Sequence, residues 1–174
     1  QLIMIDGYSN DGTWEYLLSK KSKIDVLIQS KPKGIYNAMN IAIDYIKCDY
    51  HIFINSSDEI HLADKIQRIN NPCFIPVKTN SKKQFKSQPK KYNFLGMIYC
   101  HQGIIFPSLG IKYDERFSIA SDYLYFLKHE KYFTDLKIKY NMGYAFFDTN
   151  GISSSLKGRL KSRIEERIII RENF

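Results

Sequence analysis

The chain has 174 residues, 44% of them hydrophobic and 25% charged, which is ordinary for one folded domain with its own core. Its formal net charge of +8 suits an anionic partner, although a solvated basic surface would give the same value. The three cysteines are widely spaced, which argues against a disulfide framework and a cysteine zinc site. No apolar run reaches the ~20 residues of a membrane span, and no nucleic-acid-binding signature accompanies the lysines.

The first third of the chain predicts strands that alternate with helices. Short apolar runs end in polar or glycine-containing turns, as buried strands do, and the apolar residues between them recur at the helical period. Thr13 is expected to cap the first helix. The expected elements are strands at 2–5, 25–29 and 50–55, a helix that opens at 13, and a helix at 35–46.

The rest of the chain predicts a less regular mixture. Ser121 is expected to cap one helix, and the serines at 153–155 to cap a last, basic helix. The basic stretch 82–91 has no period and is expected to be a loop. The expected elements are helices at 61–69, 122–129 and 156–171 and strands at 73–78, 97–106, 136–140 and 144–147.

This order predicts a single α/β domain with a mixed, largely parallel sheet flanked by helices. Ligands of such folds bind at the carboxyl ends of the strands. Asp6 and the segment 55–58 (NSSD) each follow a predicted strand, so two acidic loops should lie on the same rim. Because the chain begins with Gln1 and its first residues already read as a strand, we expect natural sequence to precede it.

Three segments in order resemble one enzyme family, glycosyltransferase family 2. Residues 3–13 (IMIDGYSNDGT) are similar to the family motif VIDGGSTDGT, and residues 33–40 (KGIYNAMN) to the end of DKGIYDAMN. Residues 49–58 (DYHIFINSSD) are similar to GDYILFLNSDD.

The resemblance continues downstream and covers nearly the whole chain. Residues 101–106 (HQGIIF) and 113–123 (YDERFSIASDY) resemble the family's acceptor-side segment, and residues 151–153 (GIS) resemble its GGIS motif. The most similar subgroup is the one that builds bacterial surface polysaccharides.

This resemblance implies the GT-A fold, which is built on a Rossmann-like sheet. It also implies an inverting reaction that transfers a sugar from a nucleoside diphosphate donor, such as a UDP-sugar, to a hydroxyl of a glycan or lipid-linked acceptor. It implies a nucleotide-sugar-binding half at 1–60, an acceptor-side half at 61–155 and a basic amphipathic helix at 156–174. The family's first strand would precede Gln1, so the sheet is expected to lack that strand and the donor site one wall.

The matched positions imply a role for each residue of the donor side. Asp6 would contact the base or ribose of the donor, Lys33 would contact the diphosphate, and Asn55 would also contact the donor. Two of these residues have a structural alternative: Asp6 could simply form a turn, and Lys33 could be an exposed loop lysine. Asp58 would bind a divalent cation, Mn or Mg, that bridges the diphosphate. Ser57 stands where the family has a first aspartate, which weakens the expected metal site.

On the acceptor side, Asp122 matches the family's general base, the carboxylate that takes the proton of the acceptor hydroxyl. The same aspartate would also stabilise the start of a helix. His101 could face the diphosphate or the acceptor, or be structural.

Three interpretations remain open from the sequence. The first is a glycosyltransferase, the second a non-catalytic nucleotide-sugar-binding relative or inactive fragment, and the third a membrane-docking module that uses the basic helix at 156–171. The apolar residues of that helix could equally pack on the domain. We expect a cytoplasmic protein, at the inner face of the cell membrane if this helix docks there, with no nucleic acid partner.

Overall fold

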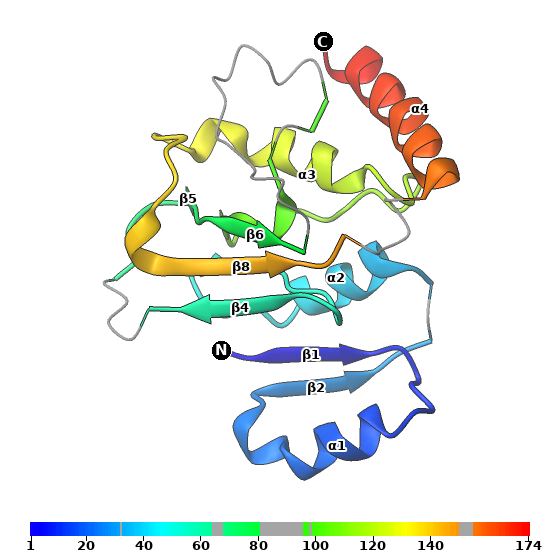
Figure 1. Cartoon of the computed structure of the whole chain (residues 1–174), viewed down its shortest axis with the longest axis vertical. Helices are drawn as coiled ribbons and strands as arrows, with labels where there is room; N and C mark the ends of the chain where they lie inside the picture. Colours follow the sequence, from blue (N-terminus) through cyan, green and yellow to red (C-terminus); the bar gives the residue numbers. More distant parts are fainter. Residues whose placement is uncertain (32, 64–67, 81–95, 98, 150–154) are drawn as a thin grey trace.

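The computed structural model describes residues 1–31, 33–63, 68–80, 96–97, 99–149 and 155–174. Figure 1 shows helices packed around three small sheets. The strands are β1 (Ile3–Asp6), β2 (Val26–Gln29), β3 (Tyr50–His51), β4 (Glu59–Leu62), β5 (Cys73–Phe74), β6 (Val77–Thr79), β7 (Ile104–Pro107) and β8 (Gly143–Phe147). The α-helices are α1 (Thr13–Ser19), α2 (Ile35–Ile43), α3 (Ser121–His129) and α4 (Leu156–Asn173). Short 3-10 turns are η1 (Lys21–Lys23), η3 (His101–Gly103), η4 (Glu130–Tyr132) and η5 (Tyr140–Met142).

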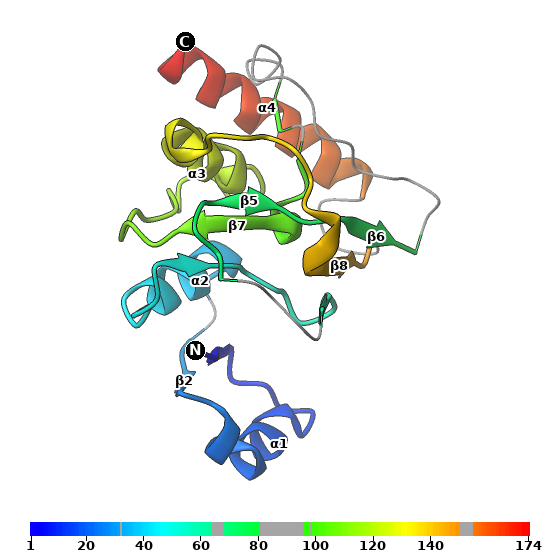
Figure 2. The ribbon, with the colours of Figure 1, turned by 90° about the vertical axis from the view of Figure 1, so that its left-hand side faces the viewer.

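The N-terminal unit, residues 3–29, is a βαβ arrangement of β1, α1 and β2 at one end of the molecule (Figures 1 and 2). Its two strands are parallel, with register from Ile3↔Val26 to Asp6↔Gln29. Helix α1 starts at Thr13, and Gly12, at φ 90°, is its cap residue. The expected cap at Thr13 is therefore wrong by one residue, because only glycine adopts this backbone conformation readily.

Strand β7 is the centre of the remaining core. Its alternate residues point to opposite faces: Ile104 and Phe106 pack with α2 and α3, whereas Ile105 packs with Ala145 of β8. Both faces are covered, so β7 reads as a continuous apolar run rather than as an alternating one. Strands β3 and β5 flank it, both antiparallel to it.

The α/β class is confirmed, but the pairing is less parallel than expected. The pairs β1–β2 and β6–β8 are parallel, whereas β3–β7, β5–β7 and β4–β8 are antiparallel. Among the described residues β1 pairs with β2 alone.

Several expected boundaries in the second half are wrong. Residues 61–62 end strand β4, which pairs with β8, instead of starting a helix, and residues 64–67 lie outside the described residues. The strand expected at 97–106 is confined to β7, and Pro76 separates β5 from β6. Of 136–140 only a bridge between Ile138 and Phe74 forms. The stretches 82–91 and 151–153 also lie outside the described residues.

Helix α4 packs against α3 through a narrow face. Gly158, Glu165 and Ile169 are its buried residues, and Ile169 contacts the cluster that contains Tyr123 of α3. Ser155 caps α4 as expected, since its hydroxyl oxygen accepts the N–H of Gly158 at 3.0 Å. In the part of the chain that the structure describes, no helix is both long and apolar enough to cross a membrane.

Candidate active site

A cavity of about 280 Å³ lies between the N-terminal unit and helix α2. It sits at the carboxyl ends of β1 and β2 and at the amino end of α2, where α/β folds bind their ligands. Its lining residues are Ile5, Gly7, Ser30, Lys31, Lys33, Gly34, Ile35, Asn37 and Ala38. Two lysines and the free N–H groups of a helix start favour an anionic ligand.

Asp6 is buried between the lining residues Ile5 and Gly7. Its carboxylate accepts hydrogen bonds from the backbone N–H of Ser9 and the side-chain amide of Gln29, both at 3.1 Å. Burial opposes ionisation, but these hydrogen bonds outweigh it and lower the pKa of Asp6. The ionised carboxylate orders the loop after β1 and keeps further acceptor sites for a ligand.

Lys33 is exposed and precedes Gly34, whose φ of 107° starts helix α2. Lys33 lines the cavity, whereas Asp6 is not one of its lining residues and bonds to Ser9 and Gln29 beside it.

The expected metal loop forms a tight turn in which the Asp58 N–H donates to the carbonyl of Asn55 at 3.0 Å. One carboxylate oxygen of Asp58 accepts the Gln102 side-chain amide at 2.9 Å, and the other accepts the backbone N–H of Asp148 at 3.0 Å. Ser57 is exposed beside it.

Asp58 could supply one ligand to a divalent cation. Each of its oxygens keeps a lone pair beside the hydrogen bond that it accepts, and the remaining ligands would have to come from outside this side chain. Among the described residues, no group of three or more His, Cys, Asp or Glu side chains could hold a metal unaided.

Asp122 lies in the first turn of α3 and accepts the backbone N–H of Tyr123 at 2.8 Å. Burial raises the pKa of Asp122 to about 7, against the lowering effect of the hydrogen bond from the Tyr123 N–H and of the nearby Tyr36 hydroxyl. A carboxylate that titrates near neutral pH is suited to take a proton there.

Helix α2 connects the cavity with Asp122. Tyr36, the second residue of α2, donates its hydroxyl to the carbonyl of Ile119 and lies within reach of the Asp122 carboxylate. The amino end of the same helix lines the cavity.

Cys100 is a buried thiol on the electrostatic border between Asp58 and Asp122. The thiol donates to the Gln102 side chain at 3.1 Å, and burial, with smaller contributions from Asp58 and Asp122, raises the pKa of Cys100 to about 12. The two carboxylates, far apart in the sequence, therefore act on the same thiol.

His101 is not at the cavity. It is buried among aromatic rings, with Nε2 2.6 Å from the Tyr113 hydroxyl and its ring 5.9 Å from that of Phe53. Burial, with a smaller effect of His51, lowers the pKa of His101 to about 3. This placement favours the structural reading of His101 over a diphosphate or acceptor contact.

Residues 1–108 of this chain match the family model of glycosyl transferase family 2. The chain belongs to glycosyl transferase family 2. No curated protein sequence matches it at a significant level.

Solved structures with a similar fold include TarS of S. aureus. TarS 1–349 in complex with UDP-GlcNAc superposes with a TM-score of 0.65 at 14% identity, over 97% of this chain and 57% of that chain. TarS 1–349 in complex with UDP gives a TM-score of 0.62 at 14% identity, over 85% of this chain and 51% of that chain. The chain therefore spans about half the length of these proteins, and the likeness shows that this family 2 domain has the GT-A fold.

Two contacts in this family 2 site could not be predicted from the sequence. Gln102 lies in a matched segment, yet its bond to Asp58 joins positions 44 residues apart. Glu165 of α4 holds the backbone ahead of Asp122, and no local pattern marks it. Both depend on tertiary structure.

Proposed function

We propose that this domain transfers a sugar from a nucleoside diphosphate donor, UDP-linked, to a hydroxyl group with inversion at the anomeric carbon. The observation that carries the proposal is the position of Asp122, beside Tyr36 of the helix whose amino end forms the cavity. Family membership supports the reaction class. The UDP and UDP-GlcNAc complexes of TarS, a protein of the same fold, support the donor class.

In the proposed reaction Asp122 takes the proton of the acceptor hydroxyl while its oxygen bonds to the anomeric carbon. The bond from that carbon to the diphosphate oxygen breaks, and the nucleoside diphosphate leaves with the electron pair. A single displacement inverts the configuration, and it requires one base rather than the paired carboxylates of a two-step retaining mechanism.

The donor-side residues act by binding and orientation. Lys33 and the amino end of α2 would attract the diphosphate, and Asp6 and Asn55 would contact the rest of the donor. Asp58 would hold a Mn or Mg ion, which offsets negative charge on the leaving diphosphate. Because a hydroxyl is a poorer cation ligand than a carboxylate, Ser57 predicts weak metal affinity.

The acceptor belongs to the same proposal. The similarity of residues 101–106 and 113–123 to the surface-polysaccharide subgroup supports a hydroxyl of a glycan or lipid-linked acceptor, with a hexose as the sugar transferred. It also supports a site of action in the bacterial cytoplasm.

Calorimetric titration of the chain with UDP, with and without Mn, tests donor binding, and hydrolysis of UDP-sugars tests turnover. We expect UDP to bind and Asp122→Asn to lower turnover by about 10²–10⁴-fold while UDP affinity stays the same. Turnover should rise with pH through about 7, as Asp122 ionises. Absence of UDP binding would exclude the enzyme, and binding without turnover would favour a non-catalytic relative or inactive fragment.

A second role, contact with an anionic membrane, is favoured by the outer face of α4. The apolar residues that could have packed on the domain are exposed instead, with exposed fractions of 79% for Leu156, 62% for Leu160, 52% for Ile164 and 41% for Ile168. The exposed basic residues of the helix are Lys157, Arg159, Lys161, Arg163, Arg167 and Arg171. Glu165 and Glu166 are turned inward. An interleaved basic and apolar face suits the interface of a bilayer with anionic lipid.

Flotation with vesicles tests this contact without any need for turnover. The chain should float with mixed phosphatidylglycerol and phosphatidylcholine vesicles, less at high salt, and not with phosphatidylcholine alone. The double variant Leu160→Glu, Ile164→Glu should lose flotation, whereas Tyr16→Glu, at an exposed site on α1, should keep it. Failure of the unaltered chain to float would refute membrane contact and leave the enzyme proposal untouched.

A further inference from the structure

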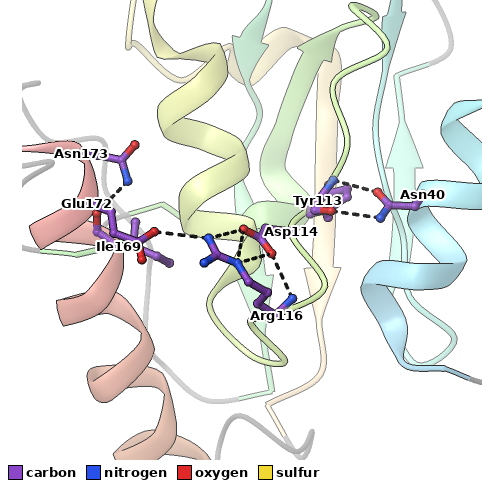
Figure 3. Close-up of polar contacts among 7 residues, drawn as sticks. All are labelled: Asn40, Tyr113, Asp114, Arg116, Ile169, Glu172 and Asn173. Carbon is purple, nitrogen blue, oxygen red and sulfur yellow. Dashed lines mark hydrogen bonds and ion pairs between the residues drawn. The ribbon is translucent and has the colours of Figure 1, made fainter.

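The segment that leads to Asp122 is held from two directions. On the α2 side, the Asn40 side chain donates to the carbonyl of Tyr113 at 3.0 Å and accepts the Tyr113 N–H at 2.7 Å (Figure 3). Glu115 also accepts hydrogen bonds from Asn37 at 3.0 Å and from Asn40 at 2.9 Å. These bonds fix the beginning of the segment.

On the α4 side, the Glu165 carboxylate fixes its end. One oxygen accepts the backbone N–H of Ser118 at 3.1 Å and the Ser118 hydroxyl at 3.2 Å. The other accepts the N–H groups of Ile119 and Ala120, both at 2.9 Å. Asp122 follows two residues after Ala120.

Glu165 holds the residues just before α3, at a helix start that has no side-chain cap of its own. The cap residue of α3 is Ala120, which has no side-chain hydrogen bond to offer. Ser121, the expected cap, is fully buried, and its hydroxyl has no partner among the described residues. The acceptor for the N–H groups ahead of α3 therefore comes from a helix 45 residues away.

The chemistry of this contact sets it apart from ordinary packing. Glu165 is only 6% exposed, yet its hydrogen bonds to Ala120, Ile119 and Ser118 outweigh its burial and lower its pKa. A buried carboxylate that accepts several backbone N–H groups fixes their direction, which an apolar side chain at the same place could not do.

A second side chain of α4, Glu172, also contacts this segment, but it is much more exposed to solvent than Glu165 is. The Arg116 guanidinium lies 2.8 Å from Asp114 and 3.3 Å from Glu172 (Figure 3). These groups are largely exposed to solvent on the Arg116 and Glu172 side, so the bond to Glu172 contributes little. It supplies a matched control on the same helix.

We propose that Glu165 is a positioning residue for the catalytic base, holding residues 118–120 so that Asp122 stays beside Tyr36. The proposal rests on the proposed function for the meaning of Asp122, but its contacts stand independently. It makes α4 a part of the acceptor-side site, although no residue of α4 lines the cavity.

The test compares Glu165→Gln and Glu165→Asp with Glu172→Gln in the whole chain. The glutamine places N–H groups against N–H groups, and the aspartate keeps the charge but is one methylene too short. Both should lower turnover of UDP-GlcNAc by about 10-fold or more with KM for the donor unchanged, because only the base has moved. Glu172→Gln should stay within about 2-fold of the unaltered chain.

A carbon-13 NMR titration of the Asp122 carboxyl detects a change in its position and does not require the enzyme to turn over. A more solvated Asp122 should titrate about one pH unit lower in both Glu165 variants, with folding checked by circular dichroism. Unchanged titration and turnover in Glu165→Gln would overturn the proposal. Restoration by Glu165→Asp would also overturn it, because charge alone would then explain the effect. If the unaltered chain shows no turnover, the proposed function fails while the titration still decides this inference.

Discussion

The N-terminal unit and the core around β7 differ in how fully they bury their strands. All four residues of β7 are buried, and Ile104 and Phe106 are 0% exposed. In β1 and β2 every residue except Asp6 is only partly buried, and Leu17 is the one buried hydrophobic residue among the described residues 1–31. Asp122, the proposed base, therefore belongs to the well-packed part, and the cavity lies at the border with the less buried part.

This difference indicates where a bound ligand would add most to the stability of the fold. A region with few buried apolar side chains opens at a lower free energy than the core does. The donor cavity is lined by residues from the N-terminal unit and from α2, so a bound nucleotide adds contacts where the chain has fewest of its own.

The largest expected effect is in the core. Phe106→Ala should lower the free energy of unfolding by about 3–5 kcal/mol, because it leaves a cavity between α2 and α3. Leu17→Ala, in a less enclosed place, should cost about 2 kcal/mol or less. Urea unfolding curves measure both, and equal losses would mean that the two regions do not differ as described.

Donor binding should stabilise the N-terminal unit most. UDP at a hundred times its dissociation constant adds about 2.7 kcal/mol to global stability. In hydrogen exchange the amides of β1 and β2 should gain protection, while those of β7, already protected, should change only with global unfolding. An equal gain of protection at every amide would contradict the prediction that the N-terminal unit is less stable than the core.

Ionisation of Asp122 should make the free energy of unfolding depend on pH. The folded-state pKa of Asp122, about 7, lies above the ordinary value of 3.8, so its contribution to stability is complete below that lower value and is lost as pH rises through about 7. Asp122→Asn removes this loss and should raise stability at pH 8 by up to about 4 kcal/mol, with a change below about 1 kcal/mol at pH 4. Thermal melts at both values test this; a constant difference between the two proteins would refute it.

The smallest effect concerns the loop after β1. Tyr8 has a φ of 62° and occupies the position of the second glycine in the family motif. This conformation costs a non-glycine residue about 1 kcal/mol, partly offset by the entropy that glycine loses on folding. Tyr8→Gly should therefore raise stability by less than about 1 kcal/mol. A drop in stability would show that the Tyr8 ring makes contacts that outweigh the strain.

The N-terminal elements were predictable because their signals are local. β2 was expected at 25–29 and α2 at 35–46, and the structure has Val26–Gln29 and Ile35–Ile43. The position of Asp6 at the end of β1 followed from strand order, and the position of Lys33 in the cavity agrees with the family motif.

The other elements and contacts could not be predicted, because they depend on residues that are distant in the sequence. β4 forms because residues 59–62 pair with β8, more than 80 residues later, although the stretch has a helix-like composition. Ser121 was a reasonable cap by residue type, but its hydroxyl has no partner among the described residues, and Glu165 of a distant helix holds the residues before α3 instead. The placement of His101 in the core likewise depends on Tyr113 and Phe53.

The two-way bond between Asn40 and Tyr113 has a thermodynamic consequence. Asn40 is on α2, the helix that starts at the cavity, and Tyr113 begins the segment that ends at Asp122. A ligand that orders α2 must then also favour the ordered segment, and by reciprocity the ordered segment must raise affinity for that ligand. Through this linkage, a ligand in the cavity is coupled to the segment that positions Asp122, the proposed base.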